Sequence, residues 1–546
     1  MQEEDIMNRL SLGLSEFDNI IKENKIYVDK TKFIKKMMDQ GRKYYFLSRP
    51  RRFGKTLLVS TLENFFQGKK ELFKDTYIYD NWEDWSEYPI IRISMSDILN
   101  TTPRKLKNGI LNKLDFIASI HDIELDKTED YVSEFSKLIY KIYKNNEEKE
   151  VIVLIDEYDA PILDHINNTG LASDNRKILQ NFYNVLKNNE EHLKFVFITG
   201  ITKFTKTSIF SKFNNFVELT LHEDYTTICG ITHKEFKHYY HDQIEVMALK
   251  NKLTYDEVLD KFNHWYDGYS WDGINKVYNP FSTLNALYER KFMGFWFGSG
   301  TPTFLAETFK HKEIIEDYSK PRELKYTELD AIDPENINLT ALLFQGGYLT
   351  IDKEFIQEDI IRFSLKIPNF EVEQAYKDNL LNIYLNEVEE DIIDVRGKLW
   401  EDIKKGDCES LSDYLEIQFD EIPYHLNLTN KRDRWKVKQI IFLKLVEYMG
   451  FKAKGEVAIS QGRIDAVFRN KNHIIVSEVK YTQNQKKSID DLMNKSLNQI
   501  HEKQYYRIYK KKNYTVILLA LAFKDVKINK KDILTEVKCK IEILNN

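Results

Sequence analysis

Three consecutive residues, Gly54, Lys55 and Thr56, follow an apolar run and a basic loop and open a helical pattern. The surrounding stretch, residues 46–58, reads FLSRPRRFGKTLL. A strand that ends in a tight loop and leads into a helix starting with Gly-Lys-Thr is the arrangement that holds a nucleoside triphosphate. Loop amides and the positive helix end surround the phosphates, the lysine reaches their oxygens, and the threonine hydroxyl binds Mg²⁺. These residues predict a site for ATP or GTP.

The match to the full phosphate-loop pattern is incomplete. Arg49, followed by Pro50, stands where that pattern has a glycine. We expect Arg49, Arg51 and Arg52 to replace part of the glycine flexibility with positive charge beside the phosphates. The structural alternative is a basic turn that only caps a helix.

A second element supports the nucleotide interpretation. Residues 151–155 form a continuous apolar run that ends in Asp156 and Glu157. Such a run is typical of a central strand in a parallel sheet, and ligands bind at the carboxyl ends of those strands. Asp156 is expected to hold magnesium and Glu157 to orient or deprotonate the attacking water. An acidic pair that caps a helix is the alternative. The residues predicted to contact the nucleotide are Arg52, Phe53, Gly54, Lys55, Thr56, Leu57 and Asp156, with Thr56 and Asp156 as metal ligands.

A third strand is predicted at residues 193–200. It ends in Thr199, and Thr202 and Lys203 follow. Each of these polar side chains is a candidate sensor of the γ-phosphate. Ordinary turn residues after a strand are the alternative for each one.

A different kind of site is predicted near the C-terminus. Residues 463–468 and 473–480 read as neighbouring strands joined by a turn. Glu478 and Lys480 are two residues apart on one strand, so their side chains point the same way, and Asp465 on the adjacent strand can reach the same point.

This convergence predicts nuclease chemistry. We expect a divalent cation on Asp465, Glu478 and Glu456, with the Val479 carbonyl as a further ligand. The cation polarises a phosphodiester and activates water, while Lys480 positions the nucleophile and offsets transition-state charge. Gln499 and Tyr505, on a following helix, are candidates to contact water or substrate. The alternative is an exposed hairpin with cross-strand ion pairs.

Composition and charge limit the class of protein. The chain has 546 residues, 42% hydrophobic and 30% charged, which is typical of a soluble, multidomain globular protein. Residues 431–546 carry 26 Lys and Arg against 12 Asp and Glu, although the net charge of the chain is -6. A basic module on an acidic body predicts a polyanionic partner, most plausibly nucleic acid. We expect this partner to be DNA in preference to RNA. A solvated lysine-rich surface is the alternative.

The N-terminus lacks the basic start and apolar core of a signal peptide, and no apolar run approaches the length needed to span a bilayer. The three cysteines, Cys229, Cys408 and Cys539, are far apart and predict neither a metal cluster nor a disulfide framework. We therefore expect a cytoplasmic protein in a reducing compartment, with no membrane partner.

The chain is expected to be α/β in class and to divide into four parts. Residues 1–225 alternate strands and helices around the two phosphate-site motifs, as in a P-loop NTPase with a parallel-sheet core. Residues 226–360 read as a helical lid with a small winged or hairpin element, residues 361–430 as a connecting helical region, and residues 431–546 as the nuclease-like domain.

Several motifs together resemble known families. YVDKT, FLSRPRRFGKTLLVSTLENFF, IVLIDEYDAPI, FITGITKF, WYDGY, VYNPFS and LLFQGGYLTI resemble the AAA-ATPase-like family of bacterial and archaeal proteins. GRIDAVF, IIVSEVKY and QIHEKQYY resemble the PD-(D/E)XK nuclease domain that is common at the C-terminus of that family. The resemblance implies a P-loop ATPase fused to a restriction-endonuclease-like α/β domain. It also implies that Arg49 does not mark a dead site, because the family itself carries SRPRRFGK.

The function predicted is ATP hydrolysis, with Mg²⁺, that gates a metal-dependent nuclease using Mg²⁺ or Mn²⁺. Defence or mobile-element biology is a hypothesis from the architecture. One alternative is an ATP-dependent switch whose nuclease-like domain binds nucleic acid or protein without cutting. Another is a nuclease with a structural, non-hydrolysed nucleotide. The sequence leaves homo-oligomerisation open.

Overall fold

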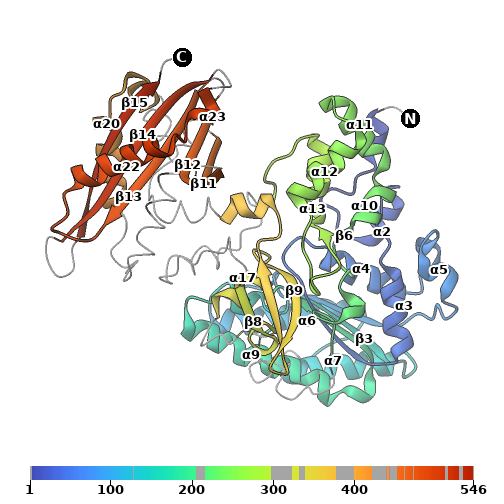
Figure 1. The fold of residues 1–546 in the computed structure, drawn as a ribbon. Coiled ribbons are helices and arrows are strands. Elements are labelled where there is room, and N and C mark those ends of the chain that lie inside the picture. Colours follow the sequence, from blue (N-terminus) through green and yellow to red (C-terminus); the bar gives the residue numbers. More distant parts are fainter. Residues whose placement is uncertain are drawn as a thin grey trace. The chain divides into compact units, whose positions relative to one another are not determined.

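A computed structural model describes most of the chain. The described residues are 3–126, 128–204, 216–296, 322–330, 332, 338–376, 399–420, 438, 442, 452–459, 462–470, 473–510, 514–527 and 533–544. They form two compact units, each with its own sheet (Figure 1). Unit 1 contains the described residues up to Tyr376, and unit 2 contains those from residue 399 onward.

Unit 1 is built on a five-stranded parallel sheet in the order β2-β3-β4-β1-β5. Its strands are β1 (Tyr44–Ser48), β2 (Ile90–Ser94), β3 (Val151–Asp156), β4 (Leu193–Gly200) and β5 (Val217–Glu218). Every residue of β1 and β3 is buried, as expected for central strands covered on both faces. The predicted parallel-sheet core is confirmed.

Helices precede and connect these strands. They are α1 (Glu3–Asn8), α2 (Phe17–Lys22), α3 (Thr31–Gln40), α4 (Lys55–Phe66), α5 (Tyr77–Asn81), α6 (Pro103–Ile120), α7 (Tyr131–Asn145), α8 (Ala160–Leu163) and α9 (Thr169–Asn188). Helix α4 follows β1 directly and packs on β2, β3 and β4, so its N-terminus lies at the carboxyl edge of the sheet.

A second helical layer of unit 1 contains α10 (His233–Tyr239), α11 (His241–Asn251), α12 (Tyr255–Tyr266) and α13 (Pro280–Glu289), with short strands β6 (Ile231–Thr232) and β7 (Val277–Tyr278). Capping boxes start α10 at Thr232 with Glu235 and α12 at Thr254 with Glu257. Helix α1 packs on α11, and Met7 lies in the same apolar core as Phe236 and Phe262. The N-terminal residues therefore complete this helical layer.

A small sheet completes unit 1. Strands β8 (Arg322–Lys325), β9 (Thr350–Gln357) and β10 (Ile360–Lys366) pair antiparallel in the order β8-β10-β9, next to α16 (Tyr326–Asp330) and α17 (Leu339–Gln345). The β9–β10 pair forms a hairpin, and β10 continues beyond residue 360, into residues for which the sequence predicts a connecting helical region.

Unit 2 contains a five-stranded mixed sheet in the order β11-β12-β13-β14-β15. The strands are β11 (Lys452–Ile459), β12 (Gly462–Asn470), β13 (His473–Thr482), β14 (Thr515–Lys527) and β15 (Ile533–Leu544), and only β13 and β14 pair in parallel. Helix α22 (Ile489–Lys503) packs on β13 and β14, α20 (Glu409–Asp420) packs on β15, and α23 (Arg507–Lys510) follows α22. Of residues 434–449, only Lys438 and Phe442 are described.

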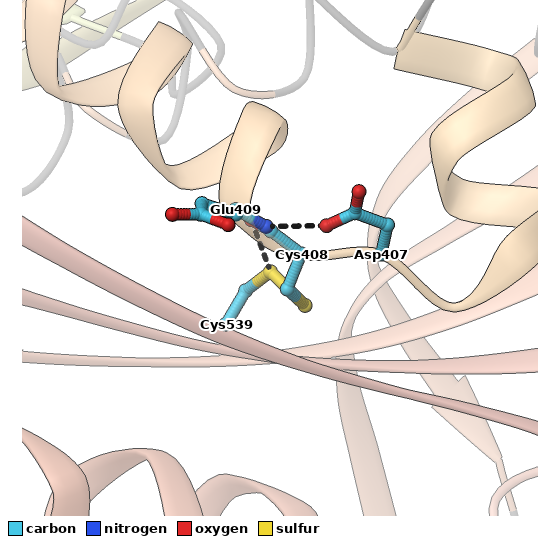
Figure 2. The surroundings of a disulfide bond; sticks show 4 residues. All are labelled: Asp407, Cys408, Glu409 and Cys539. Carbon is cyan, nitrogen blue, oxygen red and sulfur yellow. Dashed lines mark hydrogen bonds between the residues drawn. A yellow bond between two sulfur atoms is a disulfide. The ribbon is translucent and has the colours of Figure 1, made fainter.

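The prediction that the cysteines form no disulfide is wrong. Cys408 and Cys539 are joined by a disulfide between the start of α20 and the middle of β15 (Figure 2). They are 131 residues apart in sequence, so their spacing carries no sign of pairing. Packing of α20 on the sheet brings them together, and Glu416 of this helix accepts a hydrogen bond from the Val537 amide of β15 at 2.6 Å.

No helix within the described ranges combines the length and apolar character that a bilayer crossing needs.

We expect Cys408→Ser to destabilise unit 2. The disulfide closes a long loop, and such bonds are worth about 2–4 kcal/mol. Without reductant, the thermal transition of unit 2 should fall by several degrees in the variant, and dithiothreitol should lower the wild type to the same value. Peptide mapping without reduction should recover one linked peptide pair containing Cys408 and Cys539. Three free thiols in the unreduced protein would contradict the bond.

Candidate nucleotide-binding and nuclease sites

The turn after β1 leaves the N-terminus of α4 open. Gly54 has φ of 92°, a left-handed conformation that favours glycine, and a Cβ built there meets nothing within 4 Å. Helix α4 begins at Lys55, and no side chain caps its first amides. The amides at the positive N-terminal end of this 12-residue helix are uncapped, and they are next to open space. They form an anion-binding arrangement.

A cavity of about 570 Å³ lies against this helix start. The polar residues that line it include Arg51, Arg52, Lys55, Thr56 and Glu157. The apolar residues that line it include Leu14, Tyr27, Val28, Phe281 and Leu284. A cavity lined by phosphate-binding groups and by apolar side chains has the character of a nucleotide site.

Three groups predicted to act on the phosphates and metal lie together. The Lys55 ammonium is buried and donates to the Pro50 carbonyl at 3.0 Å. The Thr56 hydroxyl donates to the Asp156 carboxylate at 2.7 Å. Burial raises the pKa of Asp156, while the Thr56 hydroxyl and Lys55 ammonium oppose that rise. The contact between Thr56 and Asp156 joins the start of α4 to the end of β3.

Glu157 lines the same cavity. Its φ of 51° is unusual for a non-glycine residue, and its amide donates to the Asp156 carboxylate at 3.0 Å. The next amide, of Tyr158, donates to the Thr199 carbonyl of β4 at 3.0 Å. These hydrogen bonds hold the backbone that presents Glu157 to the cavity.

The donor set fits a magnesium nucleotide. A threonine hydroxyl and a carboxylate already touch each other at the helix start, and both are oxygen ligands of the type that Mg²⁺ prefers. A buried ammonium and open backbone amides stand beside them. The side chains present match those that would hold such a group.

The three candidate γ-phosphate sensors differ in their surroundings. The Thr202 hydroxyl donates to Asp159 at 2.6 Å, and the Lys203 ammonium pairs with Glu218 at 3.0 Å. Both side chains are thus held by structural partners. The Thr199 hydroxyl is buried and makes no hydrogen bond within the described part of the chain.

The expectation that Arg49 places charge beside the phosphates is wrong. Its guanidinium is buried and donates to the carbonyls of Ser48 and Thr220 at 2.9 Å and of Tyr225 at 3.2 Å. Its central carbon lies 3.9 Å from the centroid of the Trp271 ring. Burial lowers the pKa of Arg49 to about 10, so its guanidinium remains charged at neutral pH. Its hydrogen bonds to these carbonyls stabilise the loop.

The other loop residues have distinct positions. Arg52 lines the cavity and stacks on Phe281, 3.8 Å from the ring centroid. Its φ of 67° places it in the left-handed region. The Phe53 ring is buried, and Leu57 lies on the first turn of α4 at the cavity edge. Arg51 and Arg52, and not Arg49, are the arginines at the cavity.

Sequence reasoning assigned no role to several residues around this cavity. Tyr27 and Phe281 line it and belong to the YVDKT and VYNPFS motifs, whose aromatic residues were the available signal. Asp159 is fully buried and accepts hydrogen bonds from the amides of Ile201 and Thr202. It joins the loop after β3 to the loop after β4.

The second predicted site lies on β13. Glu478 is buried, and the Lys480 ammonium donates to its carboxylate at 2.7 Å. Gln499 of α22 also donates to this carboxylate and lies 3.3 Å from the Tyr505 hydroxyl. The structure thus brings together four of the side chains predicted for the nuclease site, and α22 positions Gln499 by packing on β13.

For the remaining predicted metal ligands, the structure describes only the position of the backbone. Glu456 lies on β11 and Asp465 on β12, but their side chains are outside the described residues. Asp465 directly precedes Ala466, the register partner of Ser477, and Glu478 directly follows Ser477. Val479 is opposite Leu521 of β14. Metal binding by these residues stays a prediction.

Comparison with known proteins identifies both parts of the chain. Residues 11–210 match the family described as predicted AAA-ATPase, and residues 436–533 match the PD-(D/E)XK nuclease superfamily. A protein of Azotobacter chroococcum mcd 1, described as an uncharacterized protein in the vnfD 5′ region, is 31% identical over 518 residues, covering 94% of this chain and 96% of that protein. The chain belongs to the AAA-ATPase-like family. This AAA-ATPase-like protein carries a C-terminal PD-(D/E)XK nuclease superfamily domain, so the predicted resemblance is confirmed.

We expect the neighbouring arginines of the AAA-ATPase-like protein to respond differently to substitution. Arg49→Met leaves three buried carbonyls without their donor and should destabilise unit 1 by about 2–4 kcal/mol. Arg51→Met removes only a charge at the cavity. It should leave the melting temperature within 1–2 degrees, roughly the effect of an ordinary surface change, and weaken MgATP binding about tenfold.

Thermal unfolding followed by circular dichroism, together with ATP titration of each variant, checks this difference. Equal melting temperatures for Arg49→Met and wild type would contradict the structural role of Arg49.

Proposed function

We propose that the chain binds and hydrolyses ATP at the cavity on the N-terminus of α4. The observation that carries this proposal is the 2.7 Å hydrogen bond between Thr56 and Asp156, with Glu157 beside them at the cavity. Amides of Arg52 to Leu57 bind the phosphates, and Lys55 offsets their charge. Mg²⁺, held by Thr56 and Asp156, supplies further stabilisation of charge on the phosphates. Glu157 orients the attacking water and accepts its proton.

The C-terminal domain is proposed to cleave phosphodiester bonds. Its metal ligands are Asp465, Glu478, Glu456 and the Val479 carbonyl, and Mg²⁺ or Mn²⁺ polarises the scissile phosphate when bound there. Lys480 positions the nucleophile and stabilises negative charge in the transition state. The buried Glu478 carboxylate, oriented by Lys480 and Gln499, supports this assignment.

The two activities are proposed to be coupled, so that the nucleotide state gates cleavage. The excess of Lys and Arg in residues 431–546 favours a nucleic-acid substrate, DNA in preference to RNA. We place the protein in the cytoplasm of a prokaryote, although the Cys408–Cys539 disulfide removes the cysteine argument for a reducing compartment. We also propose a role in defence or mobile-element biology and include a homo-oligomer among its functional forms.

Cleavage of plasmid and single-stranded DNA, with Mg²⁺ or Mn²⁺ and with or without ATP, tests the whole proposal. Lys480→Ala should reduce cleavage by about 10²- to 10³-fold, because it removes charge stabilisation in the transition state. Lys55→Ala should abolish ATP turnover and change the ATP dependence of cleavage. Glu157→Gln should keep ATP binding but stop hydrolysis. Lys495→Ala, which removes an exposed lysine of α22, is the matched control and should stay within about twofold, as for other exposed sites.

A second function is an ATP-dependent switch whose nuclease-like domain binds nucleic acid or protein without cutting. The contacts of Lys480 and Gln499 with Glu478 favour it, because two donors to one oxygen of a buried carboxylate also fit a purely structural role. Intact ATP turnover with no cleavage by the wild type under any of these conditions would select the switch.

A further inference from the structure

The phosphate loop, residues 49–54 between β1 and α4, is covered by a turn from the helical layer of unit 1. This turn, residues 267–273, lies between α12 and β7 and is here called the aromatic turn. The Phe53 ring packs edge-on against Tyr269 and Trp271, with centroid separations of 4.8 and 5.6 Å. The Phe53 carbonyl accepts a hydrogen bond from the Gly230 amide at 3.2 Å. The residue before Gly54 is therefore held by its side chain and its backbone.

The same turn reaches the other end of the loop. Trp271 covers the Arg49 guanidinium, which binds three carbonyls beneath the loop. Neither Trp271 nor Tyr269 lines the cavity, so neither is placed to contact a nucleotide. Their contacts indicate that they position the loop and do not bind the ligand.

On its other side, the aromatic turn contacts the segment that leads out of unit 1. We call residues 368–376 the exit segment, because Tyr376 is the last residue of unit 1 before the chain passes to unit 2. A Cβ built on Gly268 would lie 2.2 Å from the Pro368 carbonyl oxygen, so the two backbones are in direct contact.

The exit segment is also anchored by side chains. Phe370 stacks on His264 at 4.8 Å and meets Trp265 edge-on at 4.7 Å between ring centroids. Glu371 is buried and accepts hydrogen bonds from the amides of Phe295 and Trp296 at 2.6 and 2.9 Å. The exit segment thus packs on the end of α12 and on the turn that holds Phe53.

We propose that the aromatic turn positions the phosphate loop for nucleotide and that the exit segment responds to the state of that loop through this turn. A nucleotide that orders the loop stabilises Phe53 against Tyr269 and Trp271, and this in turn stabilises Gly268 against Pro368. This inference rests on the proposed nucleotide site. The residues named here are those through which nucleotide binding affects the exit segment, where the chain leaves unit 1.

Hydrogen exchange of the full-length protein, with and without the Mg²⁺ complex of AMP-PNP, a non-hydrolysable ATP analogue, tests this coupling. Peptides from the phosphate loop, the aromatic turn and the exit segment should all exchange more slowly in the complex. Peptides from α7, which lies outside this set of contacts, provide the internal reference. Isothermal titration on the same samples measures AMP-PNP affinity independently of any nuclease activity.

Three variants separate positioning from general folding. Trp271→Leu should weaken AMP-PNP binding about tenfold and abolish the slowing in the exit segment. Phe370→Leu, which does not line the cavity, should weaken binding about fivefold, because coupling between two sites is reciprocal. Ile274→Ala, one residue beyond the aromatic turn and 81% exposed, is the control and should match the wild type. Circular dichroism confirms that each variant is folded.

Slowed exchange in the loop but not in the exit segment, with binding intact, would overturn the inference and leave the nucleotide site standing. Wild-type affinity in both Trp271→Leu and Phe370→Leu would overturn it equally. Absence of AMP-PNP binding to the wild type would instead remove the proposed nucleotide site, and the inference with it.

Discussion

The shape of the phosphate loop in unit 1 depends on the hydrogen bonds that stabilise two buried cations. Arg49 and Lys55 are both buried within one short turn, and cations in such places need hydrogen-bond acceptors. The acceptors are the carbonyls of Ser48, Thr220 and Tyr225 for Arg49, and the Pro50 carbonyl for Lys55. Because these carbonyls come from the end of β1 and from the chain after β5, the loop keeps its shape only when the sheet edge is complete.

This arrangement explains why the candidate catalytic and metal-binding groups of unit 1 lie together at one edge of the sheet. The end of β3 brings Asp156 to the helix start, where its burial is offset by the Thr56 hydroxyl and the Lys55 ammonium. The end of β4 supplies the Thr199 carbonyl that holds the backbone after Glu157. In unit 2, the buried Glu478 carboxylate has a comparable place, with Lys480 and Gln499 as its partners. The groups that touch Asp156 and Glu478 are also those that position them.

Local sequence patterns were sufficient to predict much of this structure. The apolar run of β3 followed by two carboxylates, and the Gly-Lys-Thr start of α4, predicted which side chains meet at the cavity, because parallel strands and a following helix share one edge. Spacing by two on β13 similarly predicted that Glu478 and Lys480 lie together. These inferences use distances along the chain that secondary structure converts directly into distances in space.

Features that depend on tertiary packing could not be predicted in this way. Arg49 looked like a phosphate ligand because of its neighbours, but its partners Thr220 and Tyr225 are more than 170 residues away. The pairing of Cys408 with Cys539 arises from the packing of α20 on β15, which no spacing rule encodes. The contacts of Trp265 with Phe370 and of Tyr269 with Phe53 also join distant segments, so WYDGY was visible as a motif without a role.

The most direct test of the account is an experimental structure of the full-length protein with Mg²⁺ and AMP-PNP. In that structure, the phosphates should lie against the amides of residues 52–57, and Mg²⁺ should contact the Thr56 hydroxyl and lie near Asp156. The base should lie among the apolar residues that include Tyr27 and Phe281. A nucleotide bound elsewhere, or a cavity in which Lys55 still binds the Pro50 carbonyl and no phosphate is present, would contradict it.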